Sequence, residues 1–191
     1  MPPTHTRIFS TSKPSLNPDN DLTISLLQDD LVWAGTERGA VFSFKVDTSV
    51  GKLSKGHRHL VAEGFKVTSI VSRPSSTNTR ILINVANNSL LLFTVTDTMG
   101  SLSLYRQFSV VHTDLNIRSS FAPLMSYRSG ECVVSASQDG GVYFFDVSRS
   151  SKSCINKLQA HSFPALAVAF NYNETFLATS DNSGLVIVWK R

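Results

Sequence analysis

The chain has 191 residues, 41% hydrophobic and 17% charged; this excludes a mostly disordered protein, since disorder needs few apolar residues and a high net charge. Its 10 glycines exclude a collagen-like repeat, and its 2 cysteines exclude a disulfide-stapled scaffold. The net charge of +4 is small and diffuse, so it does not predict direct nucleic-acid binding. No run approaches the ~18 apolar residues of a membrane span, and the first residues lack a signal-peptide pattern. We therefore expect a soluble intracellular protein with no membrane partner.

Turn-forming residues dominate the start of the chain. Residues 1–21 are rich in proline, asparagine and aspartate, and predict a flexible N-terminal arm. From Leu22 onward, short apolar runs alternate with turn signals, and no helical periodicity lasts three turns. Short strands separated in this way predict an all-β fold, either a sandwich, a barrel or a propeller.

Internal repeats favour the propeller. Four segments share one order of strands and turns, and we place them at residues 22–62, 63–111, 112–160 and 161–191. The third strand of each segment ends in an aromatic residue: Phe44, Phe93, Phe145 and Trp189. These aromatics lie 49, 52 and 44 residues apart, close to the roughly 40–45 residues of a four-stranded propeller blade. A single blade cannot bury both faces of its sheet, so the repeats are expected to stack around an axis.

The third and fourth segments carry the most informative motif. Residues 132–146, CVVSASQDGGVYFFD, resemble the WD40 repeat signature, with Phe145-Asp146 in place of the Trp-Asp pair. In the fourth segment, Ala160-His161 stands for the Gly-His pair, and Trp189 closes the repeat.

This resemblance covers residues 22–191 and implies a WD40 β-propeller of about four blades. Because four repeats are about half of the usual ring, we expect an incomplete, C-terminal part of a larger propeller. A second possibility is that residues 6–11 supply a closing strand for a compact four-bladed ring.

The resemblance also implies a buried polar chain in each blade, from a turn Asp to a loop His, then to a strand Ser or Thr, and finally to the Trp indole. In the third segment the candidates for this structural WD motif are His112, Ser135, Asp139, Phe145 and Asp146. In the fourth they are His161, Thr179 and Trp189, with Ser183 in place of the Asp. On this interpretation no segment keeps the full chain.

No constellation of residues predicts catalysis. His112 and His161 occupy matching loop positions, which favours structural roles. The chain lacks zinc-binding spacings, nucleotide-binding glycine loops and a nucleophile elbow, so we predict no enzyme, no metal and no cofactor. The basic cluster around His57 and His59 is better explained as the cover of an outer edge strand than as a phosphate site. Cys132 is expected to be a free buried thiol, as is Cys154.

Binding surfaces therefore remain as the candidate functional sites. One rim of a propeller presents the loops that enter each blade and the turns between second and third strands. The partner-binding candidates on this rim are Glu37, Arg38, Gln138, Ser162, Phe163 and Asn182. An exposed aromatic residue beside arginine and amide side chains is typical of interface hot spots, and Phe163 is the first anchor candidate.

We expect a non-catalytic scaffold that binds other proteins and no small-molecule substrate. Three short runs resemble the end of an animal branch of the WD40 family: residues 122–128, 142–147 and 156–162. That branch is largely nuclear, so the resemblance implies histone-deacetylase or corepressor partners, transcription regulation, and a location in the nucleus with the cytoplasm as a second compartment. One alternative is a substrate adaptor of a ubiquitin ligase, although Arg149 lies one position later than the arginine typical of such adaptors. Another is a truncated fragment without independent activity.

Overall fold

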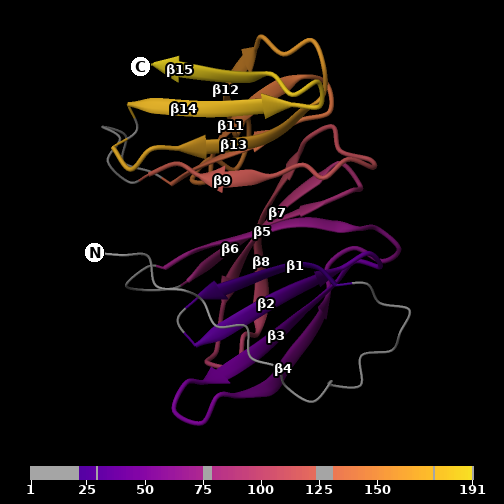
Figure 1. Cartoon of the computed structure of the whole chain (residues 1–191), viewed down its shortest axis with the longest axis vertical. Helices are drawn as coiled ribbons and strands as arrows, with labels where there is room; N and C mark the ends of the chain where they lie inside the picture. The colour runs from indigo at the N-terminus through magenta and orange to yellow at the C-terminus, as the bar shows by residue number, and fades with distance from the viewer. Residues whose placement is uncertain (1–21, 29, 75–78, 124–130, 174, 191) are drawn as a thin grey trace.

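The computed structural model describes residues 22–28, 30–74, 79–123, 131–173 and 175–190. Every regular element in these residues is a β-strand, and the strands form four antiparallel sheets that follow chain order (Figure 1). The first sheet contains β1 (Leu22–Gln28), β2 (Leu31–Thr36), β3 (Ala40–Asp47) and β4 (Lys52–Leu60). The second contains β5 (Val67–Arg73), β6 (Arg80–Val85), β7 (Ser89–Val95) and β8 (Leu102–Ser109).

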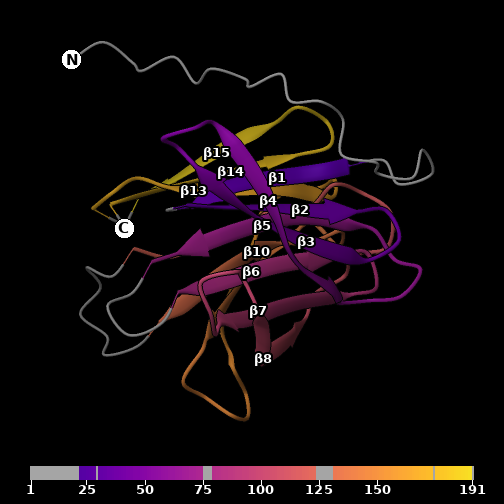
Figure 2. The ribbon, with the colours of Figure 1, turned by 90° about the horizontal axis from the view of Figure 1, so that it is seen from below.

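The third sheet contains β9 (Ser119–Phe121), β10 (Cys132–Ala136), β11 (Gly141–Asp146) and β12 (Cys154–Gln159). The fourth contains β13 (Ala165–Phe170), β14 (Phe176–Asp181) and β15 (Val186–Lys190). Within each sheet the strands lie side by side in chain order, as Figure 2 shows for β5 to β8. The all-β fold and its arrangement as an incomplete β-propeller are confirmed.

The closing aromatics occupy the same place in all four sheets. Each aromatic residue lies on the third strand of its sheet and is paired with the second residue of the neighbouring strand. The pairs are Phe44 with Val32, Phe93 with Ile81, Phe145 with Val133, and Trp189 with Leu177. In the first three sheets, a register shift between the third and fourth strands falls at this aromatic residue. The repeat seen in the sequence is thus a repeat of strand register.

Each sheet has two faces, because side chains alternate along a strand. We call the face toward the following sheet the forward face and the opposite one the backward face. Trp33 and Val41 on the forward face of the first sheet pack against Ile81, Ile83 and Phe93 on the backward face of the second. The same arrangement recurs at the next two junctions. The second sheet packs on the third through Leu82, Leu90 and Leu92 against Phe121, Val133 and Phe145. The third sheet packs on the fourth through Val134, Ala136 and Val142 against Val168 and Leu177.

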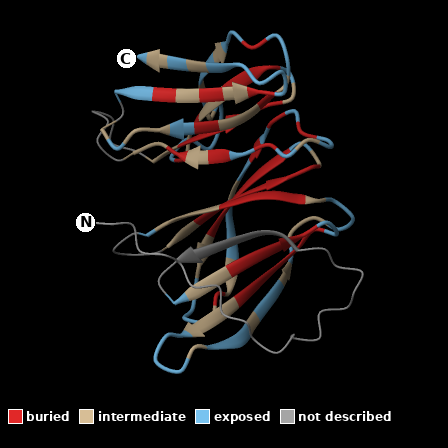
Figure 3. Cartoon of the chain, in the orientation of Figure 1, coloured by how far each residue is buried: buried red, intermediate tan, exposed pale blue. Residues whose placement is uncertain are grey.

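Within the described residues, the apolar core is divided among three junctions between neighbouring sheets. Figure 3 shows buried residues concentrated where neighbouring sheets meet, with exposed residues along β4 and β15 at the two ends. The first and fourth sheets lie at opposite ends of the long axis (Figure 1).

The arm at residues 1–21, including the candidate closing strand at residues 6–11, lies outside the described residues. Cys132 lies on β10 and Cys154 on β12, separated by β11, and the two do not form a disulfide with each other. The prediction that both are buried was wrong: Cys154 is exposed on the outer strand of its sheet, and Cys132 is half-buried.

Candidate functional site: the loop rim

Backbone hydrogen bonds join the loops at one edge of the sheets into a continuous rim. We define this rim as the turns at residues 37–39, 86–88, 137–140 and 182–184 together with the loops at 61–66, 110–118 and 160–164. The loops at 61–66 and 110–118 are each bonded to the turn of their own sheet and to the turn of the next. The loop at 160–164 is bonded to the turn of the next sheet, and Ala165, directly after it, donates to the Ser137 carbonyl at 3.0 Å. The amide of Val61 donates to the Gly39 carbonyl at 2.9 Å, and the amide of Ala86 donates to the Lys66 carbonyl at 2.9 Å.

The two later loops are held in the same way. The Asn88 amide donates to the His112 carbonyl at 2.8 Å, and the Gln138 amide donates to the Val111 carbonyl at 2.7 Å. The Asn182 amide donates to the Pro164 carbonyl at 3.0 Å. Because loop backbones tied at both sides lose little further freedom on binding, this rim can present side chains to a partner at low entropic cost.

Three large apolar side chains are exposed on the rim, one in each loop between consecutive sheets. Phe163 is 55% exposed, in agreement with its prediction as an exposed aromatic residue. Phe65 and Val111, which sequence reasoning missed, are each 47% exposed. Their only sequence signal is that each lies in a polar loop directly after an outer strand.

The polar rim candidates divide into free and engaged side chains. Arg38, Ser162 and Asn182 are exposed. Glu37 is also exposed, and it forms an ion pair with Lys66 of the adjoining loop at 3.6 Å.

Gln138 has a mainly internal role. Its side-chain oxygen accepts from the Thr113 amide at 2.7 Å, and its side-chain nitrogen contacts the Asp114 carboxylate. It therefore holds the loop at residues 110–118 in place, and its polar atoms already have partners within the chain.

Below the rim, the fourth sheet contains a complete buried polar chain. His161 Nδ1 donates to Asp181 Oδ2 at 2.9 Å, and His161 Nε2 lies 2.7 Å from Thr179 Oγ1. The Trp189 indole nitrogen donates to the same hydroxyl oxygen at 2.9 Å. The Asp181 carboxylate places the histidine proton on Nδ1, so that Nε2 accepts from Thr179, and every polar atom in the chain has a partner.

Asp181 corrects the assignment of Ser183 to the aspartate position. Asp181 Oδ1 accepts from the Ser183 hydroxyl at 2.6 Å and from the Ser183 amide at 2.9 Å. The hydrogen bond from the Ser183 hydroxyl, together with the bond from His161, outweighs burial and lowers the pKa of Asp181 to about 2. Ser183 therefore supports the aspartate instead of replacing it, and one repeat keeps the full chain.

The third sheet does not bring its predicted chain together. His112 is buried, but its Nε2 donates to the Leu115 carbonyl at 2.8 Å and lies 3.3 Å from the Thr68 hydroxyl of the second sheet. Burial, opposed by the bond to the Leu115 carbonyl, lowers the pKa of His112. Ser135 bonds to Ser119 at 2.8 Å. Asp139 lies at the surface, bonded to the Gly141 amide, the Lys157 ammonium and the Tyr143 hydroxyl.

Phe145 and Asp146 have different roles: Phe145 packs against the second sheet, and Asp146 stabilises a turn. The Phe145 ring stacks on Phe108 of the second sheet with ring centroids 4.9 Å apart. Asp146 accepts from the Ser148 amide at 2.9 Å and pairs with Arg149 at 3.1 Å. The Arg149 side chain therefore forms its ion pair within its own turn.

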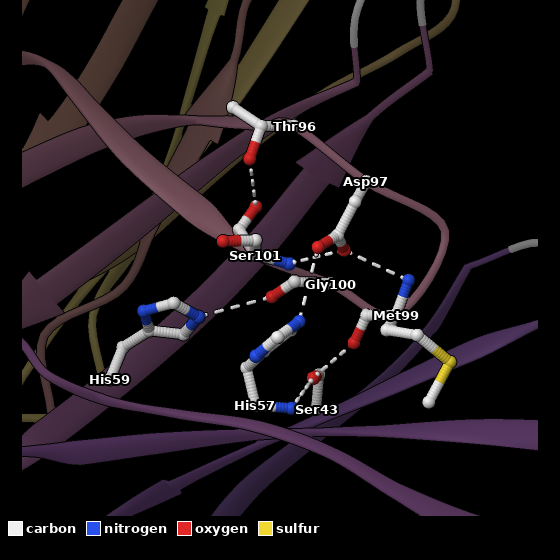
Figure 4. A network of polar contacts seen from close by, with 8 residues as sticks. All are labelled: Ser43, His57, His59, Thr96, Asp97, Met99, Gly100 and Ser101. Atoms are coloured by element: carbon white, nitrogen blue, oxygen red, sulfur yellow. Dashed lines mark hydrogen bonds and ion pairs between the residues drawn. The ribbon is translucent and has the colours of Figure 1, made fainter.

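The basic cluster on β4 forms a clasp between the first and second sheets (Figure 4). His57 Nε2 lies 3.1 Å from Asp97 Oδ2, and His59 Nε2 lies 3.1 Å from the Gly100 carbonyl. Ser43 donates to the Met99 carbonyl at 2.6 Å. At Gly100, whose φ is +87°, an added Cβ would fall 2.6 Å from Ser43 Cβ, so the close approach needs glycine. These contacts hold the loop at residues 96–101 against β4.

Comparison with known proteins agrees with this geometry. Residues 152–190 match the family model "WD domain, G-beta repeat", a segment that contains β12 and the fourth sheet with its polar chain. The crystal structure of the computationally designed Ika4 protein is similar in fold, with a TM-score of 0.59 and 16% sequence identity over 94% of this chain and 99% of that chain. The fold is therefore that of an incomplete β-propeller, and its last repeat is similar to a WD40 repeat.

No group of three or more metal-ligating side chains occurs in the described residues. In the same part of the chain, no helix is long and apolar enough to cross a membrane.

Proposed function

We propose that this chain is a non-catalytic scaffold that binds a partner protein on the loop rim. The observation that supports the proposal best is the exposure of Phe163, Phe65 and Val111 on loops whose backbones, or the residue directly after them, are hydrogen-bonded to neighbouring turns. Arg38 and Asn182 border this row with exposed polar groups. Apolar anchors beside polar groups on a rigid edge are typical of interface hot spots.

The partner class comes from sequence resemblance. Residues 122–128, 142–147 and 156–162 resemble WD repeat-containing protein 13, so we propose a partner among histone-deacetylase corepressor assemblies and a place in nuclear transcription regulation. The ubiquitin-ligase alternative has less support, because Arg149 pairs with Asp146 in its own turn.

The test uses the full chain, immobilised, and a purified histone-deacetylase corepressor assembly as the probe. Replacing Phe163→Ala is expected to weaken retention of deacetylase activity about tenfold or more, as loss of an anchor does. Phe65→Ala and Arg38→Ala are expected to weaken it by smaller factors. The matched control is Leu104→Ala, a 54% exposed apolar residue on β8 away from the rim, which should leave retention unchanged.

Two results would contradict the proposal. One is unchanged retention by Phe163→Ala, Phe65→Ala and Arg38→Ala while their circular dichroism matches that of the unmodified chain. The other is the absence of retention by the unmodified chain, which would favour a fragment without independent binding activity.

A further inference from the structure

Two arginine side chains of the second sheet contact the ring of Tyr105. The guanidinium carbon of Arg80 lies 3.6 Å from the ring centroid, and that of Arg106 lies 5.3 Å from it. Arg80 is two residues before Leu82 on β6, so it shares the forward face with that residue. Arg106 is paired with Leu92 across β7 and β8 and lies on the same face. Two positive charges therefore gather beside one aromatic ring.

Tyr105 owes its position to an irregularity in β8. The register between β7 and β8 shifts between Leu92 and Phe93, and Tyr105 is the residue of β8 that the shift leaves without a paired position. A bulge of this kind redirects a side chain. The irregularity thus places the tyrosine ring against the two arginines.

Neither Arg80 nor Arg106 is neutralised by a carboxylate of the described residues, whereas Arg73 on β5 pairs with Glu131 at 4.0 Å. Arg106 Nε donates to the Val147 carbonyl at 3.2 Å, which fixes this side chain across the junction to the third sheet. Arg80 Nη1 is buried and has no hydrogen-bond acceptor in the described part of the chain. A buried charged donor without an acceptor is costly, so the pair of arginines gains free energy from an anionic ligand.

The charge of this arginine pair fits a phosphate group. The two guanidiniums contribute two positive charges, and a phosphorylated serine or threonine carries about −1.5 to −2 at neutral pH. Its three acceptor oxygens can bond to both guanidiniums at once, whereas a carboxylate has two oxygens and one charge. Tyr105 is 43% exposed and both arginines are half-buried, so the cluster is accessible from solvent.

The strand that carries Tyr105 and Arg106 is an outer edge of its sheet (Figure 2). Among the described strands, β8 pairs with β7 alone. On β4, the outer strand of the first sheet, Lys52, Lys55 and Arg58 supply charges that discourage pairing with another chain. On β8 the one charged residue is Arg106, whose side chain is bonded to the third sheet. The outer edge of β8 is therefore suited to strand addition, in which an extended peptide pairs with the backbone.

We propose that this surface binds a phosphorylated serine or threonine in an extended segment of a partner protein. The segment pairs with β8, and Arg80 and Arg106 hold its phosphate. Arg80 begins β6, whereas the rim turn at residues 86–88 follows the end of that strand, so the two surfaces lie at opposite ends of the sheet. The phosphate site shares no residue with the loop rim and does not rest on the proposed function.

The test uses the full chain labelled with nitrogen-15 and follows the Nε–Hε resonances of its arginines. The probe is a capped peptide of about eight residues, with a phosphoserine at its centre and threonines on both sides. It is expected to shift the resonances of Arg80 and Arg106 in a saturable way. Arg80→Gln and Arg106→Gln should each weaken binding about tenfold or more, because each removes charge-assisted hydrogen bonds. The matched control Arg38→Gln removes an arginine of the loop rim and should leave binding unchanged.

Four further probes identify the chemistry of the ligand. The same peptide with glutamate in place of phosphoserine should bind about tenfold more weakly, as should inorganic phosphate and oligothymidylate. The fourth probe is the phosphopeptide with every second backbone nitrogen methylated, prepared in both alternating sets. One of the two sets should weaken binding about tenfold, because methylation removes the hydrogen bonds of strand pairing.

Several results would overturn the proposal. One is the absence of shifts at Arg80 and Arg106 when the phosphopeptide is added to the folded protein. Binding that survives Arg80→Gln, a change that breaks no hydrogen bond among the described residues, is another. Equal binding of glutamate peptide, inorganic phosphate or oligothymidylate would contradict a phosphorylated protein segment. Unchanged binding of both methylated sets would contradict pairing with β8, and a loss caused by Arg38→Gln alone would place the phosphopeptide on the loop rim.

Discussion

The third and fourth sheets hold the same strand register by different chemistry. In the third sheet both faces are covered, Phe145 closes the repeat by packing, and the predicted polar chain is not assembled. In the described part of the chain, the fourth sheet packs on the third through its backward face. Below its rim, Trp189, Thr179, His161 and Asp181 form a continuous hydrogen-bonded chain. The comparison indicates that a sheet packed on both faces keeps the strand register of the repeat without the polar chain.

The largest expected effect is in the third sheet. Phe145→Ala removes a buried ring from the junction with the second sheet and should lower the free energy of unfolding by about 3–5 kcal/mol. Urea denaturation followed by circular dichroism measures the change. The control Phe176→Ala, which removes a ring that is 44% exposed, should cost about 1 kcal/mol or less. Equal losses from the two variants would contradict the difference between the sheets.

The next effect is in the polar chain of the fourth sheet. Thr179→Val keeps the shape of the side chain but leaves His161 and the Trp189 indole without their shared partner, at a cost of about 1–3 kcal/mol. Trp189→Phe, which copies the third sheet, removes only the indole donor and is expected to cost less. A neutral Thr179→Val variant in the same urea measurement would show that the chain does not stabilise the fold.

The third prediction concerns pH. The pKa of Asp181 in the folded chain is lowered to about 2 from its ordinary value of 3.8. A lowered folded pKa means that the stabilisation from Asp181 is complete above the unfolded value near 3.8 and is lost as the pH falls toward 2. The unfolding free energy of the unmodified chain should therefore fall more steeply between pH 5 and pH 2.5 than that of Asp181→Asn. Parallel pH profiles for the two proteins would contradict the role of Asp181.

The smallest effect is expected at the surface of the third sheet. Arg149 pairs with Asp146 at 3.1 Å, with the Arg149 side chain 58% exposed. Exposed ion pairs contribute little, so Arg149→Ala should change the unfolding free energy by less than about 0.5 kcal/mol. A larger loss in the urea measurement would mean that this turn supports the sheet more than its exposure indicates.

The register of the repeats could be predicted from the sequence, because a turn followed by an apolar strand and a closing aromatic is a local pattern. Gly39, Gly140 and Gly184 have positive φ values of 78°, 78° and 90°, and Asn88 has a φ of 64° in the equivalent turn of the second sheet. These are the positions where the sequence requires a residue that tolerates this conformation.

The polar chain was only partly predictable. Asp181 is the last residue of β14, the strand that carries Thr179, whereas the repeat pattern predicted the aspartate position two residues later, at Ser183. The sequence pattern assigned His112 to the third sheet, yet its side chain contacts Thr68 of the second sheet. No local sequence pattern shows which of two neighbouring sheets a loop side chain will contact. The exposure of Phe65 and the contact of His57 with Asp97 likewise depend on how whole sheets stack.

The packing of successive sheets is tested most directly by nuclear Overhauser effects between aromatic ring protons of assigned phenylalanines. Forward-onto-backward stacking predicts a strong cross-peak between Phe108 on β8 and Phe145 on β11, whose ring centroids are 4.9 Å apart, and a weaker one between Phe144 and Phe170, at 6.5 Å. These two pairs join the second sheet to the third and the third sheet to the fourth. Absence of both cross-peaks in the folded protein would contradict the stacking of the sheets.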